Sequence, residues 1–177
     1  MDTKTAKKII VEDKDNGKRD QDIYNELSPG FPNKKTLALL ITGTAAIGER
    51  NRYKLYNNIL IGLLGLVVLL RLLGSFYLLK EGELGDFGLS LIGLLLPALF
   101  IYGIAQYNAP FYRFCGFMAI VGSISAIARE NSAGAILFDI VLIAAIAGLC
   151  FFLGNKMFPN YKPAKLKKDS NGNYLLQ

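Results

Sequence analysis

Four long apolar stretches dominate the second part of the chain, and short polar connections separate them. They cover residues 59–79, 87–107, 111–128 and 133–153. Each has close to the roughly 20 residues that an α-helix needs to cross the hydrocarbon core of a bilayer, at about 1.5 Å of rise per residue. The pattern therefore predicts an all-α fold, an integral membrane four-helix bundle formed by residues 55–154.

The rest of the chain is polar and predicts two regions outside the membrane, a short cytoplasmic N-terminal segment at 1–54 and a basic tail at 155–177. In the first region, residues 7–11 predict a short strand, and the charged residues that follow predict a segment that is partly disordered by itself. Residues 36–47 are apolar but too short to span a bilayer, so they predict an interfacial or bundle-packed helix that leads into the first span.

Composition and charge add an orientation to this picture. Hydrophobic residues make up 52% of the chain and charged residues 19%, and most of the charged residues lie outside the four stretches. Residues 1–54 carry eleven of the 20 Lys and Arg residues, and residues 155–177 carry five. By the positive-inside rule both termini are expected in the cytoplasm. The chain is predicted to cross the inner (plasma) membrane of the cell several times.

The residue types that most enzymes need are missing or badly spaced. The chain has no histidine, which removes the usual general base and the usual zinc ligand. Residues 43–48 have the glycine spacing of a phosphate-binding loop, but Glu49 and Arg50 follow where Lys and Ser or Thr are required. Cys115 and Cys150 fall inside spans at about the same depth and are expected to serve packing. We therefore expect no catalytic residues, no metal and no cofactor.

Two charges inside the spans stand out, because a charge in the membrane is costly and normally faces a partner or water. Arg71 lies in the first stretch and Asp139 in the fourth. Counting helical rise from the predicted ends places them at similar depth in antiparallel helices. The sequence thus predicts an intramembrane ion pair between Arg71 and Asp139, and a role in pinning two helices together is favoured over a direct role in permeation.

Polar residues in the middle stretches have two interpretations. Ser90 and Gln106 in the second stretch, with Ser123 and Ser125 in the third, either line a wet path in an oligomer or serve close helix packing. Pro97 frees the backbone carbonyl near Gly93 and predicts a kink, which is either simple bending or a hinge.

Basic residues flank the first predicted span and form a candidate polyanion site. Together with Tyr53 and Tyr56 they predict a collar for lipid headgroups, or for a nucleotide or oligonucleotide ligand. A cytoplasmic protein is another possible partner of this N-terminal segment. The basic residues of the collar are Lys34, Lys35, Arg50, Arg52 and Lys54.

A basic and aromatic segment running directly into an apolar span, Glu49-Arg50-Asn51-Arg52-Tyr53-Lys54-Leu55-Tyr56-Asn57-Asn58, resembles the entry to the first span of small bacterial membrane effectors of the SLATT type and related four-span effectors of antiphage defence. The resemblance implies an oligomeric pore or channel-like effector in the lipid bilayer, gated through its cytoplasmic segment. Two alternatives stay open, a non-catalytic membrane subunit that docks a cytoplasmic or membrane partner, and a small transporter.

Overall fold

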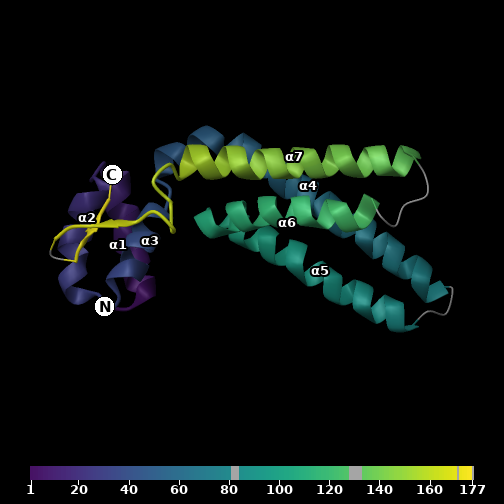
Figure 1. Ribbon diagram of the computed structural model, residues 1–177, viewed down its shortest axis with the longest axis horizontal. Helices are drawn as coiled ribbons and strands as arrows, with labels where there is room; N and C mark the ends of the chain where they lie inside the picture. Colours follow the sequence, from purple (N-terminus) through teal and green to yellow (C-terminus); the bar gives the residue numbers. More distant parts are fainter. Residues whose placement is uncertain (81–83, 128–132, 171, 177) are drawn as a thin grey trace. The chain divides into compact units, whose positions relative to one another are not determined.

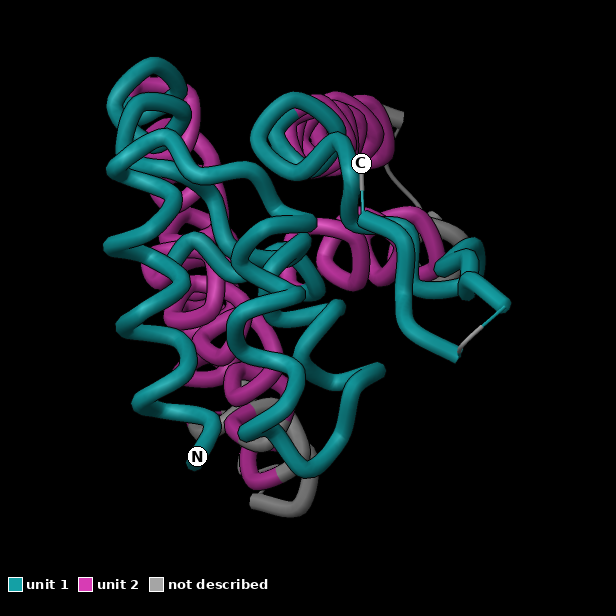
Figure 2. The backbone as a smooth tube through the Cα atoms, turned by 90° about the vertical axis from the view of Figure 1, so that its left-hand side faces the viewer, with its two compact units in different colours: residues 1–54, 107–110, 153–177 teal, residues 55–106, 111–152 magenta. Residues whose placement is uncertain are grey.

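The computed structural model describes residues 1–80, 84–127, 133–170 and 172–176, and it is mostly helical, at 78%. Seven α-helices lie in these ranges (Figure 1). The chain divides into two compact units, which Figure 2 colours separately. The head unit comprises residues 1–54, 107–110 and 153–177, and the apolar unit comprises residues 55–106 and 111–152.

Three short helices and a 3₁₀ turn build the N-terminal part of the head unit. They are α1 (Thr3–Asp15), α2 (Asp20–Leu27), the 3₁₀ turn Ser28–Gly30 and α3 (Lys34–Thr42). Side-chain caps fix two of the helix starts, because the Asp2 carboxylate accepts the Thr5 N–H at 2.8 Å and the Asn33 side chain accepts the Thr36 N–H at 3.0 Å. Hydrogen bonds from the Thr5 side chain and its N–H also lower the pKa of Asp2.

The head unit has a buried hydrophobic core to which the C-terminal tail contributes. The tail forms a two-stranded antiparallel ribbon, β1 (Lys167–Lys168) and β2 (Tyr174–Leu175), in which Lys168 lies opposite Tyr174. Tyr174 and Leu176 are buried with side chains of α1, α2, α3 and the connection between the last two. These are Ala6, Ile10, Ile23, Tyr24, Leu27, Phe31, Leu37, Ala38 and Ile41.

The structure corrects two expectations for the N-terminal segment. Residues 7–11, predicted as a strand, lie in α1, where Ala6 and Ile10 share one buried face at helical spacing. In the whole chain, α2, α3 and the distant tail cover that face and complete a core. The expectation that the segment is partly disordered by itself stays a prediction. The expected helix at 36–47 ends at Thr42 as α3, and its buried residues Leu37 and Ile41 join the head core rather than lead into the first long helix.

Four long helices follow, and each predicted span coincides with one of them. They are α4 (Ile47–Lys80), α5 (Leu84–Ala105), α6 (Ala109–Ile127) and α7 (Ala133–Met157). Within the described residues, two segments are long and apolar enough to cross a membrane, Ile47–Tyr77 in α4 and Ile136–Met157 in α7. The described apolar segments of α5 and α6 are shorter, Gly93–Ala105 and Ala109–Gly122.

The two units differ in where their large hydrophobic side chains lie. Of 27 such side chains that are exposed among the described residues, only Met1, Ile47 and Leu175 belong to the head unit, and the other 24 belong to the apolar unit. Monomeric soluble proteins rarely expose contiguous apolar surface on this scale. The surface of the apolar unit is therefore typical of contact with a membrane or with other proteins.

The head unit also contains parts of the long helices and their connections. Asp15 of α1 accepts the Ile47 N–H at 2.8 Å and so caps the start of α4. The turn between α5 and α6 meets the end of α3, since the Ala109 N–H donates to the Gly43 carbonyl at 3.4 Å. The last residues of α7, from 153 onward, belong to the same unit. One folded unit thus includes the start of α4, the α5–α6 turn and the end of α7.

A buried group of hydrogen bonds joins three helices of the apolar unit. The Tyr112 hydroxyl lies 2.5 Å from the Asn57 Oδ1 and 3.2 Å from the Ile104 carbonyl, and all three residues are buried. The Ile104 carbonyl is close to the end of α5, where the last carbonyls have no partner within the helix. Tyr112 of α6 therefore caps α5 and links it to Asn57 of α4.

We expect Ile23→Ala to lower the free energy of unfolding of the head unit by about 2–5 kcal/mol, because Ile23 is fully buried and the change leaves a cavity. Urea titration in mild detergent, followed by near-ultraviolet circular dichroism of the tyrosines, measures this. Ile47→Ala is the matched control, because Ile47 is exposed at the start of α4 and its loss is expected to cost less than about 0.5 kcal/mol. Equal losses in both variants contradict the proposed core.

Candidate functional site: a charged cavity in the apolar unit

All four long helices line one cavity in the apolar unit, with a volume of about 480 Å³. Most of its wall is apolar, with side chains such as Leu64 of α4, Phe100 of α5, Met118 of α6 and Ile146 of α7. Two charged residues share this wall, Arg71 from α4 and Asp139 from α7. A cavity of this size and lining is within the range of small-molecule sites in proteins.

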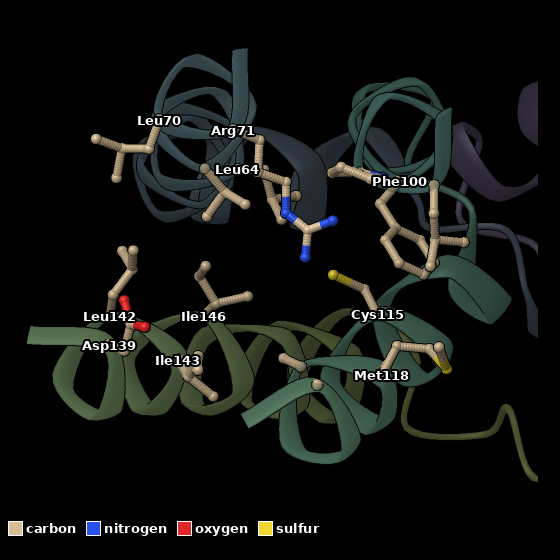
Figure 3. A pocket seen from close by; sticks show the side chains of 15 residues that line it. Leu64, Leu70, Arg71, Phe100, Cys115, Met118, Asp139, Leu142, Ile143 and Ile146 are labelled. Atoms are coloured by element: carbon tan, nitrogen blue, oxygen red, sulfur yellow. The ribbon is translucent and has the colours of Figure 1, made fainter. Parts of the chain in front are cut away.

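Arg71 extends its guanidinium into the cavity, as Figure 3 shows, and it has a backbone partner there. Its Nη1 donates to the Gly93 carbonyl of α5 at 3.2 Å. Pro97 lies four residues after Gly93 inside α5 and has no N–H, so it cannot make the helical hydrogen bond to that carbonyl. Arg71 therefore supplies the donor that Pro97 lacks, and the carbonyl freed by Pro97 has a defined partner.

Arg71 approaches α5 closely at Gly93. A Cβ atom at this position would lie 3.3 Å from the Arg71 Nη1, which is tighter than most such contacts. The backbone carbonyl of Arg71 also has a side-chain partner in its own helix, because the Ser75 hydroxyl donates to it at 2.8 Å. Gly93, Pro97 and Arg71 thus form one arrangement that spans α4 and α5.

The predicted ion pair between Arg71 and Asp139 is not formed in this structure. Neither Arg71 nor Asp139 takes part in an ion pair within 4.0 Å between described residues. Figure 3 shows the Asp139 carboxylate on the α7 side of the cavity, while the guanidinium enters from the α4 side. Helical rise correctly predicts that the two residues share one site, but the backbone carbonyl freed by Pro97 is the acceptor that Arg71 reaches.

The two cysteines lie near this cavity and next to each other. Cys115 of α6 lines the cavity, and Cys150 of α7 is buried beside it. Gly116 makes this approach possible, because a Cβ atom there would lie 3.1 Å from the Cys150 Cβ. The expectation that the two thiols are close if their helices are neighbours is confirmed.

The structure shows the surroundings of only one of the four predicted pore-lining or packing residues, Gln106. The side chains of Ser90, Ser123 and Ser125 lie outside the part of the chain that the structure describes. Gln106 follows the last residue of α5, where it is exposed and is not one of the described residues that line the cavity.

The five basic residues of the predicted collar belong to the head unit. Lys34 and Lys35 begin α3, and Arg50, Arg52 and Lys54 lie in the first turns of α4. Arg50 donates to the Ala45 carbonyl at 2.9 Å and lies over the Tyr107 ring at 5.6 Å, while Arg52 lies over Tyr53 at 5.6 Å. Tyr56, the other predicted member, packs against Phe152 in the apolar unit, with the ring centroids 5.7 Å apart.

A second, smaller cavity of about 250 Å³ lies in the head unit. Its described lining includes one charged residue, Lys7, together with Asn108, Tyr161 and Thr36. None of the five basic collar residues lines it. A polyanion at the collar would therefore bind the surface of the head unit rather than this cavity.

Two features of the sites have only weak signals in the sequence. The Gly93 carbonyl is part of the cavity, and only the spacing of Gly93 and Pro97 points to it. The Tyr107 ring over Arg50 has no local signal, because the two residues are far apart in the chain.

Comparisons with known proteins add nothing to this geometry. No protein family, no curated protein and no solved structure matches the chain. The resemblance of residues 49–58 to SLATT-type effectors therefore stays a prediction.

We expect Arg71→Met and Pro97→Ala to be energetically coupled. Arg71→Met leaves the Gly93 carbonyl without its donor, whereas Pro97→Ala restores an N–H within α5 that takes over this bond. In the Pro97→Ala background, the cost of Arg71→Met is expected to fall by about 0.5–3 kcal/mol. A double-mutant cycle of SDS-induced unfolding, followed by helical circular dichroism, measures the coupling. Additive effects within about 0.3 kcal/mol contradict it.

Proposed function

We propose that this chain is an integral membrane protein with a channel-like permeation function. Helices α4 to α7 cross the bilayer as a four-span bundle, and both termini lie in the cytoplasm with the head unit. The cavity lined by Arg71 and Asp139 lies on the path of the permeating ion or small solute. The observation that carries the proposal is this cavity, to which all four apolar helices contribute and which contains two charged side chains of opposite sign.

The surface chemistry of the two units supports a membrane location for the apolar unit. Its exposed leucine, phenylalanine, isoleucine and tyrosine side chains suit lipid tails and headgroup boundaries. By sequence it carries four Lys or Arg and five Asp or Glu, a net charge of −1, whereas the head unit carries sixteen and nine, a net charge of +7. A strongly basic head is suited to the anionic cytoplasmic face of a membrane.

The charges in the cavity support permeation over a purely structural role. A guanidinium and a carboxylate in a membrane require a partner or water, and here neither pairs with the other. Water or an ion in the cavity satisfies both. An apolar wall around a few polar groups is also the arrangement by which permeation paths control hydration.

The composition of the head unit supports gating from the cytoplasmic side. Because it includes the start of α4, the α5–α6 turn and the end of α7, a partner that changes the head unit acts on all four helices at once. The basic residues on α3 and α4 are the proposed contact for such a partner, whether an anionic lipid, a nucleotide or a protein.

A small transporter is the second candidate function. The observation that favours it is that all four long helices of one chain contribute to the lining of the cavity. A transporter predicts saturable solute uptake and counterflow, whereas a channel predicts flux that rises linearly with the ion gradient.

In liposomes containing this chain alone, we expect ion leakage that depends on the two charges in the cavity. Arg71→Met is expected to reduce chloride flux at least ten-fold, and Asp139→Asn to reduce potassium flux at least ten-fold, because each change removes the charge that attracts that ion. Chloride-sensitive and potassium-sensitive dyes inside the liposomes measure the two fluxes.

Leu73→Ala is the matched control for this experiment, because Leu73 lies on α4 two residues from Arg71 and is exposed outside the cavity lining. Leakage no greater than that of empty liposomes contradicts the permeation function. Equal effects of Arg71→Met and Leu73→Ala contradict the assigned path. Light scattering in nanodiscs adds the oligomeric state, where three or more copies support the oligomeric pore of the sequence-based prediction and a monomer supports a path within one chain.

A further inference from the structure

The C-terminal tail binds to the rest of the head unit in an extended conformation. Figure 1 shows the yellow tail lying against the purple N-terminal helices, and all of these segments belong to the head unit. A turn presents the bound part, since the Asp169 N–H donates to the Asn173 carbonyl at 2.8 Å and Gly172 has a φ of 78°. The segment that follows, Tyr174 to Leu176, enters the head core.

Two side chains of α2 bind the main chain of this segment. The Gln21 Oε1 accepts the Leu176 N–H at 2.6 Å, and its Nε2 lies 3.4 Å from the Tyr174 carbonyl as a donor. The Tyr24 hydroxyl accepts the Tyr174 N–H at 3.2 Å. Gln21 thus offers a donor and an acceptor to an extended backbone, as a neighbouring β-strand would. These bonds select an extended shape rather than a particular sequence.

Sequence selectivity comes from alternate side chains. Tyr174 and Leu176 are each 8% exposed, whereas Leu175 between them is 50% exposed. The Tyr174 ring meets the Tyr24 ring edge to face, with centroids 6.4 Å apart. This alternation, with anchors at the first and third positions, is the pattern of an extended segment on a groove.

The tail is connected to α7 by a segment that allows its release. Phe158 and Tyr161 are buried after the end of α7, but residues 162–165 are all exposed. Release of the tail beyond Tyr161 therefore leaves α7 and its end in place. Residues 162–176, when extended, reach up to about 50 Å.

We propose that the groove formed by Gln21, Tyr24 and the side chains around them is a docking site for an extended Tyr-x-Leu segment, and that the tail of a second copy of this chain exchanges with the chain's own tail. Every copy carries the same segment, so exchange preserves each of the contacts described above. The exchange links neighbouring copies through their head units. It is independent of the permeation function, because it needs no charge in the cavity.

Hydrogen exchange on the full-length protein in nanodiscs tests release. The Tyr174 and Leu176 amides are expected to exchange at least 100-fold faster than the Ile23 amide in α2, because the tail opens separately from the helices. Equal protection of tail and helix amides overturns the proposal and makes the tail a fixed part of the core.

Energy transfer between two labelled chains tests exchange. One chain carries a donor dye at Lys4→Cys and the other an acceptor dye at Ser170→Cys, both in a Cys115→Ala, Cys150→Ala background, since both positions are exposed. The donor chain also carries Tyr174→Ala and Leu176→Ala, so its own groove is free. We expect transfer to develop on mixing in nanodiscs that hold several copies.

The matched control places Tyr174→Ala and Leu176→Ala in the acceptor chain as well, which keeps the dyes and the chain density but removes the docking segment. Transfer is expected to fall at least five-fold, and Gln21→Ala in the donor chain is expected to lower it similarly. If the donor chain loses helix content, two chains with intact tails replace it and must exchange on longer mixing. Transfer that is absent, or that ignores the tail substitutions, overturns the proposal.

Discussion

The burial of Tyr174 and Leu176 among α2 and α3 is the constraint on which the organisation of the chain depends. This contact joins the two ends of the sequence in one core, so the chain leaves the head unit through α4 and re-enters it at the end of α7. The Gly43–Ala109 hydrogen bond adds the α5–α6 turn to the same unit. The start of α4, the α5–α6 turn and the end of α7 are consequently parts of a single folded unit.

Within the apolar unit, two polar side chains satisfy backbone carbonyls left open by irregularities of α5. Arg71 reaches the Gly93 carbonyl that Pro97 frees, and Tyr112 reaches the Ile104 carbonyl at the end of α5. In hydrocarbon an unpaired carbonyl costs several kcal/mol, since no water replaces its partner. The two features that interrupt regular α5, a proline and a helix end, are thus matched by donors from α4 and α6.

The sequence predicts the long helices well and the head unit poorly, and one physical reason explains both. A long apolar stretch defines its own helix, so predicted spans such as 133–153 match α7 closely. Residues 7–11 carry Ile-Ile-Val, which locally favours a strand, and only contacts with α2, α3 and a tail about 165 residues away make α1 the stable form. The same limit applies to the cavity: helical rise places Arg71 and Asp139 at one site, but a backbone acceptor does not show in a side-chain pattern.

The remaining question for the cavity is how its charges are solvated. The Arg71 guanidinium donates one hydrogen bond to the Gly93 carbonyl and has further N–H groups. Asp139 lies on the α7 side of the cavity and forms no ion pair with Arg71. An ion pair between Arg71 and Asp139 would require desolvation of both charged groups. It would also break the hydrogen bond from Arg71 to the Gly93 carbonyl, which Pro97 leaves without a donor in its own helix. Keeping them apart leaves room for water or an ion between opposite charges, in a cavity of about 480 Å³. Such a separation of the two charges is what the proposed permeation path requires, whereas a structural clamp would bring them into contact.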